Sequence, residues 1–241
     1  MNSDVNTSSF ASISLRTSAI VAGLGLLIMA ILAPIASFGI FETLIVPGDA
    51  TTTANNIVAS AGSFRIGICF SLIVAILDIV AAWALYVLLK PVNKSLSLLA
   101  AWFRIVYAAI LAFALSNLFI VLQLLNGEGY FKAFDIDQLY AQVMLFLNTF
   151  TDGWDLGLVI FGLHLLVLGY LAFKSDYNSK ILGVLVIIAG LGYTIDSFGK
   201  IISPNYSVEI SMYTFIGEVL LIFWLLWKGI KGFDKELDRN E

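Results

Sequence analysis

The sequence predicts an all-α polytopic membrane protein with six transmembrane helices, and two observations predict it: the composition and the long apolar runs. Of the 241 residues, 60% are hydrophobic and only 12% are charged, whereas a soluble domain carries about a quarter charged residues. A helix of about 20 residues crosses a hydrocarbon core of ~30 Å. The longest uncharged run lies between Arg16 and Glu42, and it is long enough for one crossing.

Six apolar segments follow one another along the chain. The first contains Pro34, which we expect to kink the helix near its far end, because proline removes a backbone hydrogen bond. Threonines at 51–53 are candidate caps for an earlier start of the second helix. The third segment is long enough to tilt or to extend past the bilayer surface. The predicted spans are residues 18–41, 66–89, 96–125, 156–173, 181–202 and 210–227.

The lysines and arginines are unevenly divided between the two ends of this predicted bundle. Three of them, Arg65, Lys132 and Lys200, lie at one end, and Arg104 lies inside a span. Because cytoplasmic loops carry an excess of Lys and Arg, the larger group at the other end predicts a multi-pass protein of the cell membrane with both termini in the cytoplasm. That group is Arg16, Lys90, Lys94, Lys174, Lys180, Lys228, Lys231, Lys235 and Arg239.

This orientation divides the chain into three parts. We expect a cytoplasmic N-terminal tail at 1–17, a six-span membrane domain at 18–229 and a charged cytoplasmic C-terminal tail at 230–241. The first span has a weakly charged flank and is longer than the apolar core of a typical signal peptide, so we expect it to be retained. The oligomeric state stays open.

The segment between the third and fourth spans has a helical period of its own. Its apolar residues recur three and four positions apart, which is typical of an amphipathic helix. We therefore expect one extracytoplasmic amphipathic helix there, lying at the outer surface or folded back as a lid. A seventh span at this place would worsen the distribution of positive charge. The apolar positions are Ile136, Leu139, Tyr140, Val143, Met144 and Leu147.

Four ionisable residues on four different spans share a depth near the middle of the bilayer. Arg104, His164 and Glu218 each lie ten residues from the lysine that bounds their span, which is about 15 Å at ~1.5 Å per residue. Asp78 lies twelve residues from Lys90, or about 18 Å. Ionisable groups at this depth are costly unless they are paired or hydrated, so we expect them to face the interior of the bundle and to meet there.

This shared depth predicts two pairs. Asp78 and Arg104 stand on adjacent spans, and a guanidinium can hold a carboxylate through two parallel hydrogen bonds. His164 and Glu218 could then share a proton, because both groups can exchange protons near neutral pH. In the alternative interpretation, both pairs only hold the helices together and have no functional role, since polar side chains also bind helices to one another in lipid.

Two further residues extend the candidate site. Tyr107 follows Arg104 by three residues and so lies on the same helix face. Asp196 lies about 24 Å from the cytoplasmic end of its span, nearer the outer face. The candidate ligand or proton site comprises Asp78, Arg104, Tyr107, His164, Asp196 and Glu218.

Several classes of function lack support in the sequence. No basic block with interleaved aromatic residues suggests nucleic-acid binding. Cys69 and His164 are the only cysteine and the only histidine, which argues against a metal site or haem. No spacing matches a catalytic motif such as G-x-S-x-G or H-E-x-x-H. We therefore expect no cofactor, no metal and no nucleic-acid partner, and we assign no catalytic residue.

Several stretches resemble those of one known family. They are "FRIG", "ALYVLLKPVNKSLSLLAAWFRIVYAAI", "FGLHLLVLGYLAF", "ILGVLVIIAGLGYTIDSF" and "GEVLLIFWLLWKG". In this order they are similar to a bacterial membrane family catalogued as domain of unknown function 4386. The resemblance runs from about residue 18 to 232 and implies a six-span bacterial integral membrane protein. It implies no activity.

Three functions remain open. The first is a small transporter or ligand-binding membrane protein, with proton coupling at the polar centre and with a small molecule or a lipid as ligand. The second is a membrane enzyme acting on a lipid or isoprenoid, in which His164 and Glu218 serve as acid and base. The third is an assembly or sensory partner that docks through the charged C-terminal tail. The shared depth of the ionisable residues favours the first.

Overall fold

The computed structural model describes residues 13–126, 134–176, 179–203 and 205–233. These residues form helices and connecting loops, and six helical segments are long and apolar enough to cross a membrane, which confirms the predicted fold class. The elements are α1 (Leu15–Pro34), the π-helix η1 (Ile35–Phe41), α2 (Glu42–Leu44), α3 (Ala50–Ala59), α4 (Ala61–Leu89), α5 (Lys94–Leu125), α6 (Ile136–Lys174), α7 (Lys180–Ile202), α8 (Ser211–Thr214) and α9 (Ile216–Lys231).

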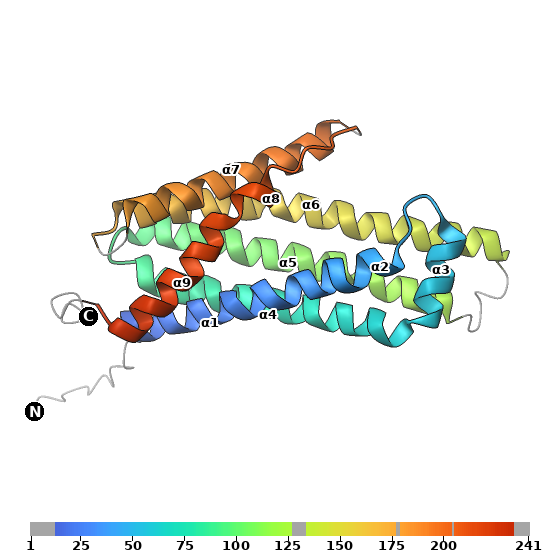
Figure 1. Ribbon diagram of the computed structural model, residues 1–241, viewed down its shortest axis with the longest axis horizontal. Coiled ribbons are helices and arrows are strands. Elements are labelled where there is room, and N and C mark those ends of the chain that lie inside the picture. The colour runs from blue at the N-terminus through green and yellow to red at the C-terminus, as the bar shows by residue number, and fades with distance from the viewer. Residues whose placement is uncertain (1–12, 127–133, 177–178, 204, 234–241) are drawn as a thin grey trace, which may run out of the picture.

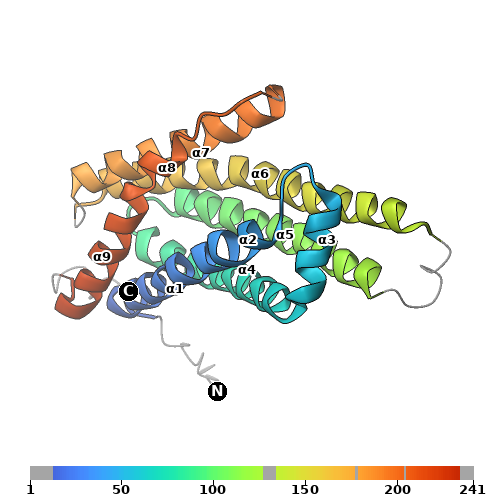
Figure 2. The same ribbon diagram turned by 45° about the vertical axis from the view of Figure 1, so that its right-hand side comes forward.

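The helices form an elongated bundle in which one span runs at an angle to the others (Figure 1). Helices α1, α4, α5 and α6 follow the long axis, and α7 packs along α6. Helix α9 crosses obliquely from α7 to the start of α1, and the turned view shows the same path (Figure 2). We call the end that holds the start of α1 and the end of α9 the terminal end, and the end that holds α3 the opposite end. The two tails predicted at 1–17 and 230–241 lie largely outside the described residues.

The predicted kink at Pro34 takes the form of a widened helix. Proline has no N–H and its ring crowds the preceding turn, and the chain after it continues as a π-helix of seven residues, Ile35–Phe41. The wide turn ends where the Glu42 N–H donates to the Ser37 carbonyl, five residues back. The first span thus extends to Leu44 as α1, η1 and α2 in series.

The π-helix directs an aromatic side chain into the bundle. The Phe41 ring packs on Gly67 of α4, where a Cβ atom would lie 2.8 Å from the ring. It also meets Phe64 and Phe150 edge-on, with ring centroids 5.5 and 5.9 Å apart. Only glycine at position 67 leaves room for this contact.

A short separate helix precedes the second span. Helix α3 is capped by Asp49, whose carboxylate accepts the Thr52 backbone N–H at 2.9 Å and the Thr52 hydroxyl at 2.7 Å. The backbone bond from Thr52 lowers the pKa of Asp49 from its ordinary value. The cap is therefore Asp49 and not one of the threonines, and α3 is separated from α4 at Ser60.

The structure corrects the expected amphipathic helix. The segment is helical as predicted, but it continues into the fourth span, so that α6 is one helix of 39 residues. At ~1.5 Å per residue this is about 58 Å, far longer than one crossing. The extra length projects at the opposite end, where α3 packs against it and the Tyr140 hydroxyl reaches Asn55 at 3.5 Å. Gly153 lies within this continuous helix and packs against Ala114 of α5.

Glycines bring α6 and α7 into backbone contact. A Cβ atom at Gly162 would lie 2.9 Å from the Gly190 carbonyl oxygen, and one at Gly169 would lie 2.8 Å from the Gly183 carbonyl oxygen. Small residues at such positions are the usual way in which membrane helices approach closely. The pair α6–α7 is therefore a rigid unit.

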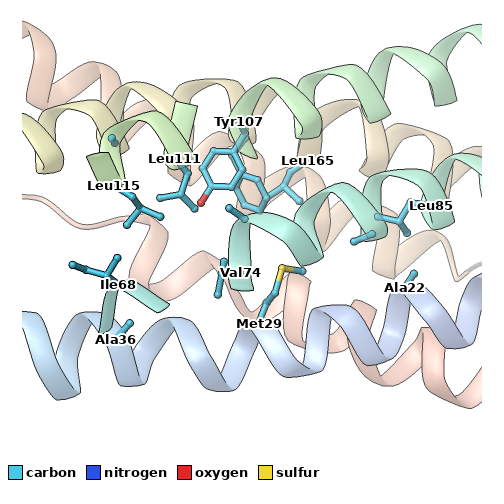
Figure 3. Close-up of a cluster of buried hydrophobic side chains, with 14 of the residues drawn as sticks. Ala22, Met29, Ala36, Ile68, Val74, Leu85, Tyr107, Leu111, Leu115 and Leu165 are labelled. Atoms are coloured by element: carbon cyan, nitrogen blue, oxygen red, sulfur yellow. The ribbon is translucent and has the colours of Figure 1, made fainter. Parts of the chain in front are cut away.

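The apolar core fills the space between the long helices. Figure 3 shows Tyr107 and Leu111 of α5 pointing toward Val74 of α4 and Met29 of α1. All four are buried. This packing lies beside the polar residues that the sequence places at mid-depth.

Candidate functional site

Arg104 is the centre of a buried polar group that joins three helices. Its Nη2 atom lies 2.6 Å from Asp78 Oδ1 of α4, and its Nη1 atom lies 3.1 Å from His164 Nε2 of α6. No more than 3% of any of these three residues is exposed. The predicted pair of Asp78 and Arg104 is confirmed, although through one bond and not two, and Arg104 Nε has no hydrogen-bond partner.

The hydrogen bonds of His164 fix its protonation state. A guanidinium can only donate, so the Nε2 atom that faces Arg104 must accept and carries no hydrogen. The Nδ1 atom lies 2.8 Å from the Ala100 carbonyl, which can only accept, so Nδ1 carries the hydrogen. His164 is therefore a neutral imidazole that ties α6 to α5.

This arrangement corrects the expected pair of His164 and Glu218. Both ring nitrogens of His164 are already bonded to α5. The sequence gives the depth of a residue in a helix but not the neighbour that it faces, and Arg104 was the nearer polar group. Because both nitrogens of the neutral imidazole are engaged, His164 cannot accept a proton from Glu218 in this structure.

Phe161 occupies the middle of the same region. The Arg104 guanidinium lies 5.4 Å from its ring centroid, and the rings of Tyr107 and Tyr193 lie 4.9 and 5.4 Å away. Sequence reasoning missed Phe161 because one aromatic residue in an apolar helix looks like ordinary core. Its position three residues before His164 was the signal available, since that spacing places both on one helix face.

Glu218 lies at the edge of this group, in the first turn of α9. The Tyr193 hydroxyl of α7 lies near its carboxyl, and it interacts over a longer range with the charges of Arg104 and Asp78. Unlike those two residues it is partly exposed. Among the residues that the structure describes, no Lys or Arg nitrogen lies within 4.0 Å of its carboxyl.

Asp196 lies apart from Arg104 and binds the loop that follows α7. Its carboxylate accepts the backbone N–H groups of Ile210 and Ser211 at 3.0 and 2.7 Å, and the Tyr206 hydroxyl at 2.8 Å. A carboxylate at the free N–H groups of a helix start is a favourable cap. Its hydrogen bond raises the pKa of Tyr206. Asp196 thus joins the loop after α7 to the start of α8, and the other five candidates gather around Arg104 and Phe161.

The last span contacts α7 near its start and α1 near its end, and its helix is interrupted close to the start. Thr214 packs against Gly192 of α7, and the helix is interrupted at Phe215 before α9 begins. Gly217 then meets the Leu185 carbonyl of α7. At the terminal end, Arg16 Nε of α1 donates to the Gly229 carbonyl at 2.9 Å. Glu218 follows directly after the contacts to α7.

One cavity in the described part of the chain lies away from these residues. It has a volume of about 260 Å³ and lies at the opposite end, between the first span and the start of α4. None of the six candidate residues lines it. Its lining residues are Gly39, Ile40, Thr43, Leu44, Ser60, Ser63 and Ile66.

The donor set at the polar centre suits proton exchange better than metal binding. His164 has no free nitrogen, and Asp78 is bonded to Arg104. Within the described ranges, no group of three or more His, Cys, Asp or Glu side chains could hold a metal ion. A carboxyl, hydroxyls and aromatic faces are the groups that remain.

Comparison with known proteins places the chain in a family. An "Uncharacterized protein" of Archaeoglobus fulgidus is 43% identical over 159 residues, which cover 66% of this chain and 81% of that relative. The resemblance implied a bacterial family, and this relative extends it to an archaeon. No solved structure matches the chain. The family described as "Domain of unknown function (DUF4386)" matches residues 21–229, which include every residue of the polar centre, and the chain belongs to that family.

Proposed function

We propose that this membrane protein is a small transporter or ligand-binding protein in which Glu218 exchanges a proton as the ligand binds. One observation carries the proposal: Glu218 is a carboxyl at mid-depth that has no Lys or Arg nitrogen within 4.0 Å among the described residues, near the ion pair of Asp78 and Arg104. An ionised carboxyl in this setting is costly. A proton or a ligand would each remove that cost, so the two would compete for one group.

The packing supports a division between a fixed part and a movable part. Of the most apolar window of the last span, 28% is buried inside the protein, compared with 50–56% for α4, α5 and α6. The break at Phe215 lies just before Glu218. Discontinuous helices next to a binding site are a recurring feature of secondary transporters. Helix α9 is therefore the element we expect to move when the ligand enters or leaves.

The orientation is part of the proposal. Both described chain ends lie at the terminal end, together with the loops that hold Lys90, Lys94, Lys174 and Lys180. An excess of Lys and Arg favours the cytoplasmic side. We therefore place the terminal end in the cytoplasm.

The geometry weakens the enzyme alternative. A general acid or base needs a nitrogen or oxygen within reach of the substrate, and both nitrogens of His164 are bonded to α5. Glu218 alone would have to serve as both acid and base. The assembly alternative rests on the C-terminal tail, which lies beyond the described residues.

Gradient-driven accumulation tests the proposed function without knowledge of the ligand. Proteoliposomes with the full chain would be incubated with a cell extract under an imposed proton gradient, and the compounds inside would be identified by mass spectrometry. We expect at least one compound to accumulate with wild-type protein but not with Glu218→Gln. Glu42→Gln, which changes an exposed carboxyl on α2, is the matched control and should leave the accumulation intact. Equal accumulation with Glu218→Gln, or none with the wild type, would contradict the proposal.

A further inference from the structure

The charges around Glu218 limit the ligand that this site can take. Asp78 and Arg104 form a pair at 2.6 Å whose charges cancel, and His164 is neutral by its hydrogen bonds. The other titratable groups that face Glu218 are the phenols of Tyr193 and Tyr107. When Glu218 loses its proton, one negative charge remains uncompensated.

Aromatic rings stand next to that charge. Tyr193, whose hydroxyl lies near Glu218, packs edge-to-face on Phe161 at 5.4 Å between ring centroids, and Tyr107 packs on Phe161 at 4.9 Å. Aromatic faces attract cations, and cages of aromatic residues recognise quaternary ammonium groups. Phe161 already contacts Arg104 at 5.4 Å, so the partly buried ring of Tyr193 is the aromatic group to which we assign the contact with a cation at the carboxyl.

An anionic ligand fits this site poorly. The terminal nitrogens of Arg104 are bonded to Asp78 and His164. The Nε–H group of Arg104 has no hydrogen-bond partner and lies on the same side of the guanidinium as Nη2. After a small rotation it can donate to the second oxygen of Asp78, so it is not left over for an anionic ligand. An added anion near Glu218 would be repelled by that carboxylate and, over a longer range, by Asp78, and no cation within 4.0 Å of Glu218 in the described residues would offset this repulsion.

A metal cation also fits poorly. Cations such as Ca²⁺ and Mg²⁺ need about six oxygen ligands, whereas in the described part of the chain Glu218 belongs to no group of three or more His, Cys, Asp or Glu side chains that could hold a metal ion. Glu218 is partly exposed on a span whose neighbouring residues Phe215 and Ile216 face outward. A bulky, weakly hydrated cation could reach the carboxyl from such a surface at little desolvation cost.

We infer that the ligand is a monovalent organic cation, which exchanges with one proton at Glu218 and packs on Tyr193; this inference rests on the proposed function. The exchange is balanced: the carboxyl O–H bond breaks, its proton leaves to water, and the cation pairs with the carboxylate. Each bound cation therefore releases one proton. Because protons compete for the same group, affinity rises about tenfold per pH unit while the carboxyl is mostly protonated.

The test uses tetraphenylphosphonium as the probe and the purified full chain in detergent. Binding is measured by equilibrium dialysis, and proton release by an indicator dye at low buffer concentration. We expect one proton released for each cation bound. Glu218→Gln should lose both, whereas Glu218→Asp should keep proton release with altered affinity, which shows that the loss is not a folding defect. Tyr193→Leu should weaken binding by about tenfold, as loss of a cation–π contact of 1–2 kcal/mol predicts.

The control and the opposing results separate two kinds of failure. Tyr213→Leu removes an exposed tyrosine of α8 and should leave binding unchanged. Equal binding to wild type and Glu218→Gln would overturn the inference, because the probe would then be partitioning non-specifically. If benzoate binds with a Glu218-dependent proton change and the phosphonium does not, the inference fails and the proposed function stands. If neither probe binds and no compound accumulates in the gradient experiment, both fail.

Discussion

The α5–α6–α7 region and the α8–α9 span differ in how their buried or partly buried polar side chains are paired. In the first, glycines bring α6 and α7 to backbone contact, and Arg104 and His164 bond α5 to α6 in the interior. In the second, the span contacts α7 at Gly217 and α1 at Gly229, and the Glu218 carboxyl has a tyrosine near it but, among the described residues, no Lys or Arg nitrogen within 4.0 Å. The ion pair and the histidine bond join α4, α5 and α6 in the interior, whereas the carboxyl of Glu218 is the group that we propose exchanges a proton and binds the ligand.

The largest effect is expected where the ion pair and the histidine bond are broken. Arg104→Met removes the cation from buried Asp78 and the donor from His164 Nε2. Removal of one partner of a buried pair costs about 3–5 kcal/mol. We expect a loss of that size in the free energy of unfolding, measured by denaturant titration in detergent.

The control for this change is an exposed ion pair. Lys200→Ala breaks the bond to Asp155, where the lysine side chain is 41% exposed, and such pairs contribute about 0–1 kcal/mol. If Arg104→Met lowered the free energy of unfolding by only about 0–1 kcal/mol as well, the bonds of Arg104 would not be what stabilises the packing of α4, α5 and α6.

A smaller loss is expected at the glycine contact between α6 and α7. Gly183→Ala would place a Cβ atom 2.8 Å from the Gly169 carbonyl and against the backbone of Phe173, neither of which can rotate away. Overpacking of this kind costs about 1–3 kcal/mol. Gly25→Ala in α1, where nothing lies within 4 Å of the added atom, should be neutral or slightly stabilising in the same assay. Equal effects at the two glycines would contradict a rigid α6–α7 contact.

The smallest effect is expected at the anchor of the last span. Asp196→Ala removes the cap from the N–H groups of Ile210 and Ser211, and loss of a cap costs about 0.5–2 kcal/mol. Hydrogen exchange should rise at residues 210–217 and stay unchanged in α6. Asp49→Ala, which removes the equivalent cap of α3, should raise exchange only there. Faster exchange throughout the bundle would show that α9 is not an independent element.

The sequence predicted the features that lipid imposes. Apolar runs marked six spans, and the cost of charge in a bilayer placed Asp78 beside Arg104 on the adjacent span. It failed where a distant contact decides the structure. Depth along a helix does not tell which neighbour His164 faces, and the sequence did not indicate that Asp196 and Gly192 of α7 contact the residues just before Phe215.

Two local features also escaped the sequence. Pro34 predicted an irregular helix, but the sequence did not indicate that the irregularity is a π-helix whose last residue, Phe41, packs on Gly67 of another span. The amphipathic period correctly indicated a helix before the fourth span. It carried no information on whether that helix stops, and Gly153 instead fits against Ala114 in one continuous α6.

Infrared difference spectroscopy of the reconstituted protein between alkaline and acidic pH tests most directly whether Glu218 is the carboxyl that takes up a proton. The account predicts a C=O stretching band of a protonated carboxylic acid that grows on acidification, disappears in Glu218→Gln and persists in Glu42→Gln. A band that survives in Glu218→Gln, or one that is lost instead in Asp78→Asn, would show that the exchanging proton belongs to another group.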